Sequence, residues 1–225
     1  MARILSYNNK ILSPEEREEF YKLADETIND FSASIDGMHQ IIKEDSSLLD
    51  EITSTIINVS TFINICYGDC IVLTKYFIMA TNLYDKRCLR GKLKVLLNES
   101  FKKLYGFNDK GYKESYCAKL ENIIQMFPSF KNKFNAILSD LEDISKHSWW
   151  KDERNAEVHI DVMKLYESRQ EEINESKVSM ETMQLIDFLH RFNLLMLGLQ
   201  HTYINHTIRV LKERGILNRE QSYLA

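Results

Sequence analysis

An arginine and a histidine five residues apart, with an asparagine directly after the arginine, are the residues of this sequence best suited to chemistry. They are Arg154, Asn155 and His159. An arginine can hold a phosphate through two parallel hydrogen bonds, and an imidazole can move a proton near neutral pH. Together these are the abilities needed to cleave RNA without a metal ion. We therefore expect these three residues to be catalytic, and we expect no metal or other cofactor.

The spacing of the motif sets geometric conditions on the helix that carries it, which we expect to begin near Asp152. Asn155 and His159 lie about 40° apart around a helix axis and share a face, whereas Arg154 and His159 lie about 140° apart. Arg154 must therefore reach across with its long side chain, the start of the helix must bend, or a second copy of the chain must complete the site. Acidic neighbours such as Glu153 are unfavourable for phosphate binding.

The overall charge leaves RNA binding to a local patch. The net charge is −4, which gives no general affinity for nucleic acid. The best candidate patch is a basic run with no acidic residue, containing Arg87, Arg90, Lys92 and Lys94. Trp149 and Trp150 could stack against unpaired bases. The alternatives are that the basic run is an ordinary solvated helix face and that the tryptophans pack a junction between helices.

The elements that must position these residues are all expected to be helices. With only 7 Gly and 2 Pro among 225 residues, the chain has few turn formers. Apolar side chains recur at three- and four-residue spacing, and Gly106 is placed to terminate a helix. We expect a loop at 108–113 and a single domain, 1–225, built as an up-and-down bundle of about five to seven helices. The expected helices span about 14–43, 46–84, 85–105, 114–127, 129–147, a segment from 152, and 179–214.

The remaining cysteines and histidines are expected to be structural. Cys66 and Cys70 would share a helix face as small buried residues, without the spacing of a metal site. His190, His201 and His206 lie among leucines of the last helix, where core or interface histidines are more common than ligands.

The sequence also predicts a cytoplasmic protein without a membrane partner. Residues 1–12 lack the apolar core of a signal peptide. The richest apolar run, 56–79, is interrupted by polar residues such as Asn64, Asp69 and Lys75, which we interpret as too polar for an ordinary membrane span.

Arg154-Asn155 followed by His159 resembles the signature of HEPN domains, helical bundles found in many prokaryotic toxins and phage-defence proteins. That signature is an arginine, usually followed by Asn, Asp or His, and then a histidine. The setting is also similar: a helix precedes the motif, a charged break follows it, and a long apolar helix ends the chain. The resemblance covers about 144–199.

The resemblance implies a metal-independent endoribonuclease in a toxin–antitoxin or phage-defence role, acting as a homodimer. It assigns proton transfer to His159, charge stabilisation at the phosphate to Arg154, and orientation of substrate or histidine to Asn155. Cleavage would leave a cyclic phosphate, and DNA would be inert because it lacks the 2′-hydroxyl. Other members of the family are non-catalytic, so the alternative is a helical interaction module that binds an antitoxin or a nucleotidyltransferase-type protein.

Overall fold

The structure is a computed structural model that describes residues 13–45, 50–146, 163, 167 and 175–215. Over these residues the chain forms seven α-helices and one 3₁₀ helix, without a strand, which confirms the predicted all-α bundle. The elements are α2 (Pro14–Asp45), α3 (Glu51–Met79), α4 (Leu83–Leu104), α5 (Asp109–Lys113), α6 (Tyr116–Met126), η1 (Pro128–Phe130), α7 (Lys131–Lys146) and α10 (Glu175–Glu213).

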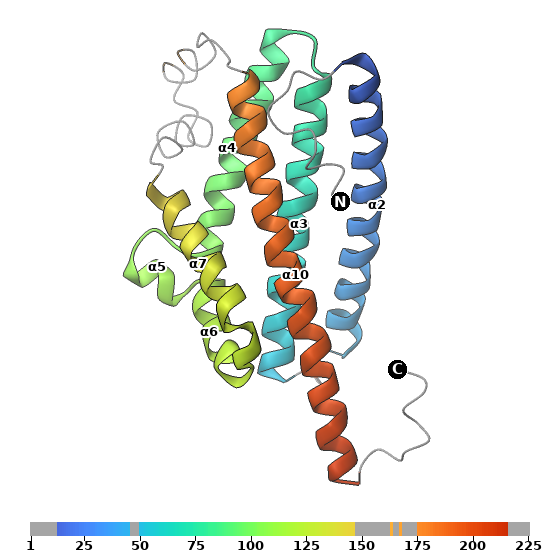
Figure 1. Cartoon of the computed structure of the whole chain (residues 1–225), viewed down its shortest axis with the longest axis vertical. Coiled ribbons are helices and arrows are strands. Elements are labelled where there is room, and N and C mark those ends of the chain that lie inside the picture. The colour runs from blue at the N-terminus through green and yellow to red at the C-terminus, as the bar shows by residue number, and fades with distance from the viewer. Residues whose placement is uncertain (1–12, 46–49, 147–162, 164–166, 168–174, 216–225) are drawn as a thin grey trace.

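Helix α3 is the centre of the bundle. It packs along α2, α4 and α10 and also contacts α6, and α7 packs against α10 and α6. Figure 1 shows the four long helices running side by side, with the last turns of α10 extending past the other helices. The four long helices therefore form the main body of the bundle, and the shorter helices α5 to α7 pack at one end of it.

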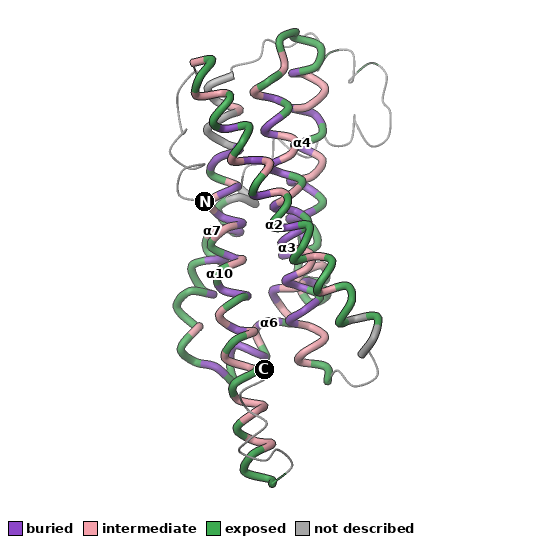
Figure 2. Tube along the Cα trace, turned by 90° about the vertical axis from the view of Figure 1, so that its right-hand side faces the viewer, coloured by how far each residue is buried: buried purple, intermediate pink, exposed green. Residues whose placement is uncertain are grey.

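One continuous apolar core joins the helices. It is built from the inward faces of α2, α3, α4, α6, α7 and α10, where buried residues recur along each trace (Figure 2). Its largest fully buried side chains are Phe20, Ile63, Tyr67, Ile71, Leu104, Leu120, Leu141, Met183, Ile186, Leu189 and Phe192. Burial of such side chains is the main force that holds a helical bundle together.

Side-chain caps decide where several helices begin. Helix α3 begins after Asp50, whose Oδ1 accepts a hydrogen bond from the Thr53 backbone N–H at 2.7 Å, which is later than the predicted start near 46. Helix α4 begins after Asn82, whose Oδ1 accepts from the Asp85 backbone N–H at 2.8 Å. Helix α3 ends at Met79, five residues before its predicted end near 84, and α4 begins at Leu83.

Gly106 ends α4 as predicted, but the segment after it differs from the prediction. Gly106 has a φ of +80°, and its N–H donates to the Phe101 carbonyl at 3.3 Å, which closes the end of the helix. The predicted loop at 108–113 was wrong, because residues Asp109–Lys113 form the short helix α5. Asn108 caps it by accepting from the Gly111 N–H at 2.8 Å.

Two polar side chains of α3 form hydrogen bonds to neighbouring helices. Ser60 accepts a hydrogen bond from Gln200 of α10 at 2.9 Å, and Asn64 donates to Ser34 of α2 at 3.2 Å. By length and composition, α3 is nevertheless the one described helix apolar enough to cross a membrane, and 56% of its most apolar stretch is buried. The prediction that the run 56–79 is too polar to span a membrane was therefore wrong as far as its length and composition are concerned. Core helices of bundles pass the same test, so the location of the protein stays a prediction.

Candidate functional site

The predicted catalytic motif lies outside the described residues. Arg154, Asn155 and His159 belong to the segment 147–162, as do Trp149 and Trp150. The structure therefore gives no distances for this site. It does describe both elements that bracket the segment: α7 ends at Lys146 and α10 begins at Glu175.

The predicted basic patch lies on α4, and its four residues differ in exposure. Arg90 and Lys94 are buried, Arg87 is half-buried and Lys92 is exposed. Arg87, Arg90 and Lys94 already take part in interactions within the chain. The four cations are thus not presented together on one exposed surface, and RNA binding by α4 stays a prediction.

Burial of these cations follows a helical repeat. Lys86, Arg90 and Lys94 are spaced four residues apart and are all buried, which places a line of positive charge along one side of α4. On the exposed side, Lys92 and Lys103 lie within about 20° of each other around the axis, with Glu99 between them. The outer face of α4 is therefore mixed in charge, whereas its concentrated positive charge is turned inward.

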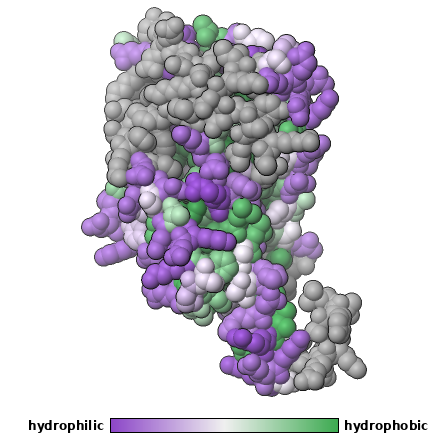
Figure 3. All heavy atoms as spheres, viewed as in Figure 1, coloured by the Kyte–Doolittle hydropathy of each residue, from purple (hydrophilic) through white to green (hydrophobic). Residues whose placement is uncertain are grey.

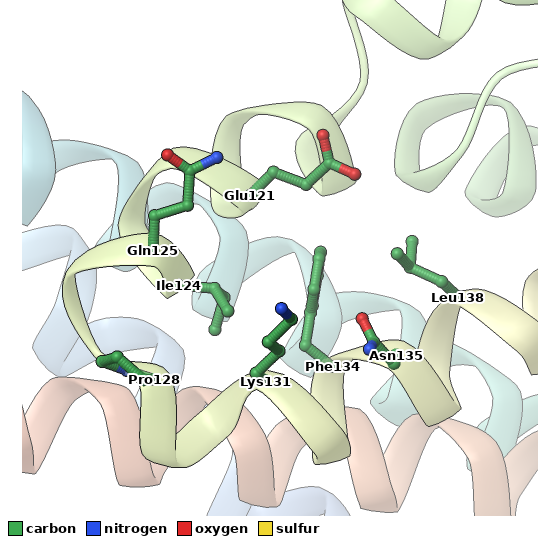
Figure 4. A pocket seen from close by; sticks show the side chains of 8 residues that line it. All are labelled: Glu121, Ile124, Gln125, Pro128, Lys131, Phe134, Asn135 and Leu138. Atoms are coloured by element: carbon green, nitrogen blue, oxygen red, sulfur yellow. The ribbon is translucent and has the colours of Figure 1, made fainter.

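A hollow lies between α6 and α7. Its volume is about 480 Å³, within the range of small-molecule sites. Figure 4 shows that both helices line it, with Lys131, Phe134 and Asn135 of α7 pointing toward α6. The full lining is Glu121, Ile124, Gln125, Pro128, Lys131, Phe134, Asn135 and Leu138.

The chemistry of this hollow favours binding over catalysis. Glu121 accepts a hydrogen bond from the Tyr112 hydroxyl at 2.6 Å, which holds its carboxylate in place. Burial and this bond to Glu121 raise the pKa of Tyr112, so the phenol stays protonated and keeps donating. No histidine or cysteine lines the hollow, so its described lining lacks a group that titrates near neutral pH or a reactive nucleophile.

The histidines of α10 do not converge on one place. His190 is half-buried, its Nδ1 has no hydrogen-bond partner, and burial lowers its pKa, partly opposed by Asp187. His201 lies beside Asn205 at 3.2 Å, and His206 lies edge-on to Phe127. Within the described ranges, no group of three or more His, Cys, Asp or Glu could hold a metal ion.

The buried cysteines are unreactive thiols, as predicted for Cys66 and Cys70. Burial raises the pKa of Cys66 to about 11, although a bond from Ser100 at 3.1 Å partly opposes that rise. Burial likewise raises the pKa of Cys70 and of Cys117 to about 12. The thiolate, which is the nucleophilic form, is therefore scarce at neutral pH. Cys88 is more exposed and lines a second hollow of about 350 Å³ near the turn between α3 and α4.

Comparisons with known proteins give no relative from which a role could be carried over. No family model matches the chain, and neither a curated protein nor a solved structure matches it.

Sequence reasoning missed the hollow between α6 and α7. Its apolar floor comes from Ile124, Phe134 and Leu138, which sequence periodicity assigns to a buried face. The departure of α7 from α6 at Pro128 leaves part of that face uncovered. The proline was a visible signal for the turn, but the angle between the helices was not readable from it.

Proposed function

We propose that the protein is a metal-independent endoribonuclease of the HEPN type. The observation that carries the proposal is the Arg154-Asn155 pair followed by His159 in an otherwise helical chain. The all-α bundle, and the long apolar helix α10 that follows the motif, support it. The proposed setting is the cytoplasm, in a toxin–antitoxin or phage-defence role.

The proposed reaction is an internal transfer of the phosphodiester. The 2′-hydroxyl attacks the adjacent phosphorus, and the bond from phosphorus to the 5′ oxygen of the next nucleotide breaks. A base removes the 2′ proton and an acid supplies a proton to the leaving oxygen, and His159 performs one of these transfers. Arg154 stabilises the negative charge on the phosphate oxygens, and Asn155 orients the substrate or the imidazole. The products carry a 2′,3′-cyclic phosphate and a 5′-hydroxyl.

The decisive experiment incubates purified protein with labelled single-stranded RNA in excess EDTA. Wild type should cleave, and Arg154→Ala and His159→Ala should each lose at least about a hundredfold in rate. Arg154→Lys keeps the charge but not the two-pronged geometry, so it should restore only a small part of the activity. His39→Ala, at an exposed histidine of α2, is the matched control and should cleave like wild type.

The outcomes separate the proposal from its competitors. RNA with a single 2′-deoxy nucleotide at the cleaved position should resist wild type, and the products should carry cyclic phosphate ends. Activity that survives in both Arg154→Ala and His159→Ala would place the catalytic site elsewhere. Absence of cleavage by folded wild type over a broad RNA panel would refute the nuclease.

The second candidate is a non-catalytic helical module that binds a protein partner such as an antitoxin or a nucleotidyltransferase-type protein. The observation in its favour is that α10 exposes large apolar side chains, including Leu194, Leu197 and Ile204. Expression in bacteria distinguishes the two candidates. Growth arrest that His159→Ala relieves favours the nuclease, whereas arrest that persists in His159→Ala, or harmless expression of wild type, favours the module.

A further inference from the structure

Helix α10 carries an apolar stripe on its solvent side. The stripe positions alternate between spacings of three and four residues, which is the repeat of a coiled-coil seam. We define the α10 stripe by these residues: Leu194, Leu197, His201, Ile204, Ile208 and Leu211. Leu194, Leu197 and Ile204 are 54%, 50% and 56% exposed, so half of each large side chain meets solvent.

The stripe is not needed for packing within the bundle, because a different face of α10 does that work. Phe192, Leu195, Met196 and Leu199 are buried in the core. Gln200 lies on the inner side as well, where it donates to Ser60 of α3. The helix is thus apolar on two sides, of which the fold uses one.

The stripe continues onto an overhang. The ring of Phe127 contacts Tyr203 and His206, with centroid distances of 6.1 and 6.0 Å, near the end of the bundle. Helix α10 continues to Glu213, past the ends of the other helices (Figure 1). The stripe therefore begins over the bundle, and its last two residues, Ile208 and Leu211, lie beyond the contact of His206 with Phe127. Figure 3 shows hydrophobic and hydrophilic residues mixed on this face, with hydrophobic residues near the middle and along the projecting end.

We propose that the α10 stripe is the interface with a second copy of this chain, in an antiparallel pair related by a two-fold axis. The register follows from the spacing. When the axis passes between residues 202 and 203, Leu194 lies opposite the partner's Leu211, Leu197 opposite the partner's Ile208, and His201 opposite the partner's Ile204. Each stripe position then meets a stripe position, so the surface is complementary to itself.

The antiparallel direction explains the overhang. In this arrangement the projecting end of each α10 lies along the exposed stripe over the other bundle. Ile204, Ile208 and Leu211 are then covered, as are Leu194 and Leu197. A parallel pair would also bring the two stripes together, but each overhang would then lie against the other overhang and would reach no part of the partner's bundle.

Charge favours the same direction. The projecting end carries Arg209, Lys212 and Arg214 against one acidic residue, Glu213, so it is net positive. The other end of the stripe lies beside Asp140 and Asp187, two carboxylates that share the guanidinium of Arg191 at 2.5 and 2.9 Å and leave a net negative charge. An antiparallel pair brings the positive end of one copy toward the negative end of the other, whereas a parallel pair brings like charges together.

This interface goes beyond the proposed nuclease, because it depends only on described residues of α7 and α10. The HEPN resemblance implies a homodimer but assigns no surface to it. The α10 pair would stand if the chain cleaved no RNA, and the nuclease would stand if the chain paired elsewhere.

The first test is the mass of the full chain in solution by sedimentation velocity. Wild type should sediment at twice the 26.5 kDa of one chain. Leu197→Glu and Ile204→Glu should each weaken pairing by about a hundredfold, because each would bury a carboxylate in an apolar seam. His201→Leu should strengthen pairing, because it replaces the one polar stripe residue.

The control tests whether surface charge alone has this effect. Leu83→Glu changes a leucine that is 55% exposed at the start of α4, away from the stripe, and should leave the dimer intact. Helical circular dichroism should be unchanged in all variants, since each changed side chain is exposed. A monomeric wild type, or a dimer that survives both Leu197→Glu and Ile204→Glu, would overturn the proposal.

Disulfide cross-linking tests the register. Leu197→Cys protein mixed with Ile208→Cys protein, both also carrying Cys88→Ser, should form the mixed disulfide under mild oxidation. Neither protein alone should cross-link, because the two copies of position 197, or of position 208, would be eleven residues and about 16 Å apart along the axis. Efficient cross-linking of either protein with itself would contradict the antiparallel register.

Discussion

The ammonium of Lys75 in α3 and the carboxylate of Asp25 in α2 form an ion pair at 2.5 Å in which the two partners differ sharply in exposure. The Lys75 side chain is 6% exposed and the Asp25 side chain 44%. The Lys75 ammonium also lies 3.7 Å from the centre of the Tyr21 ring. Burial alone would lower the pKa of Lys75, but the bonds to Asp25 and Tyr21 outweigh that effect and raise it. Lys75 therefore stays charged inside the contact between α2 and α3.

This asymmetry predicts that the two partners are not equivalent in mutation. Asp25→Asn leaves a buried ammonium without its counter-charge and should lower the free energy of unfolding by about 1–3 kcal/mol. Lys75→Met leaves a carboxylate that water can reach and should cost less than about 1 kcal/mol. Urea denaturation of both single variants and of the double variant measures these losses in the free energy of unfolding. The double variant should resemble Lys75→Met, and equal losses in the two single variants would contradict the argument.

Two isoleucines of α3 offer a test of which face of the helix is the core. Ile63 is fully buried, whereas Ile65, two residues later, is exposed. Ile63→Ala should destabilise the protein by about 2–5 kcal/mol, because the deletion leaves a cavity in a packed interior. Ile65→Ala removes the same atoms from a solvated side and should cost less than about 1 kcal/mol. Thermal and urea unfolding give both values, and similar losses would mean that the outer side of α3 is also covered.

The existence of the helices could be predicted from the sequence, but some of their ends could not. Apolar spacing predicts α2, α4 and α10, and Gly106 gives the end of α4, because these signals act within one turn of helix. Helix α5 was missed because its five residues, which include three charged side chains and one glycine, carry no periodic apolar signal. Its formation depends on the Asn108 cap, which resembles an ordinary turn residue in sequence.

The candidate site shows where local sequence ceases to be informative. A run of cations without acidic residues predicts an exposed patch, yet Arg90 and Lys94 are buried, because exposure is set by neighbouring elements and not by the run itself. The α10 stripe is the reverse case, because here the residues are exposed although the sequence alone did not show it. Its heptad spacing was present in the sequence, but the helix is apolar on two sides, and only the fold shows that Leu194 and Leu197 are on the side left open.

Gly106 and Gly37 allow the effect of replacing glycine by alanine to be compared at two different backbone positions. Gly106 has a φ of +80°, and a Cβ added there would lie 2.4 Å from the backbone of Gly111. Gly106→Ala should therefore destabilise the protein by more than about 1 kcal/mol, through strain and a clash with backbone that cannot turn away. Gly37 lies exposed within α2 with open space around it, so Gly37→Ala should stabilise by about 0.5–1 kcal/mol. Urea denaturation should show opposite signs, and a loss of stability in both variants would refute this account.

His190 predicts a loss of stability in mild acid. Burial lowers its pKa below the ordinary value of 6.5, against a smaller opposing effect of Asp187, so the folded protein keeps this imidazole neutral where the unfolded chain protonates it. As the pH falls through 6.5, the unfolded chain therefore binds more protons at this position than the folded chain does. The free energy of unfolding should decrease by up to about 1.4 kcal/mol per pH unit, until the pH reaches the lower pKa of the folded state. His190→Leu should remove this contribution, whereas His39→Gln, at an exposed histidine, should leave the slope unchanged. Urea denaturation at a series of pH values from neutral to mildly acidic measures the three slopes, and an unaltered slope in His190→Leu would show that another group controls the acid response.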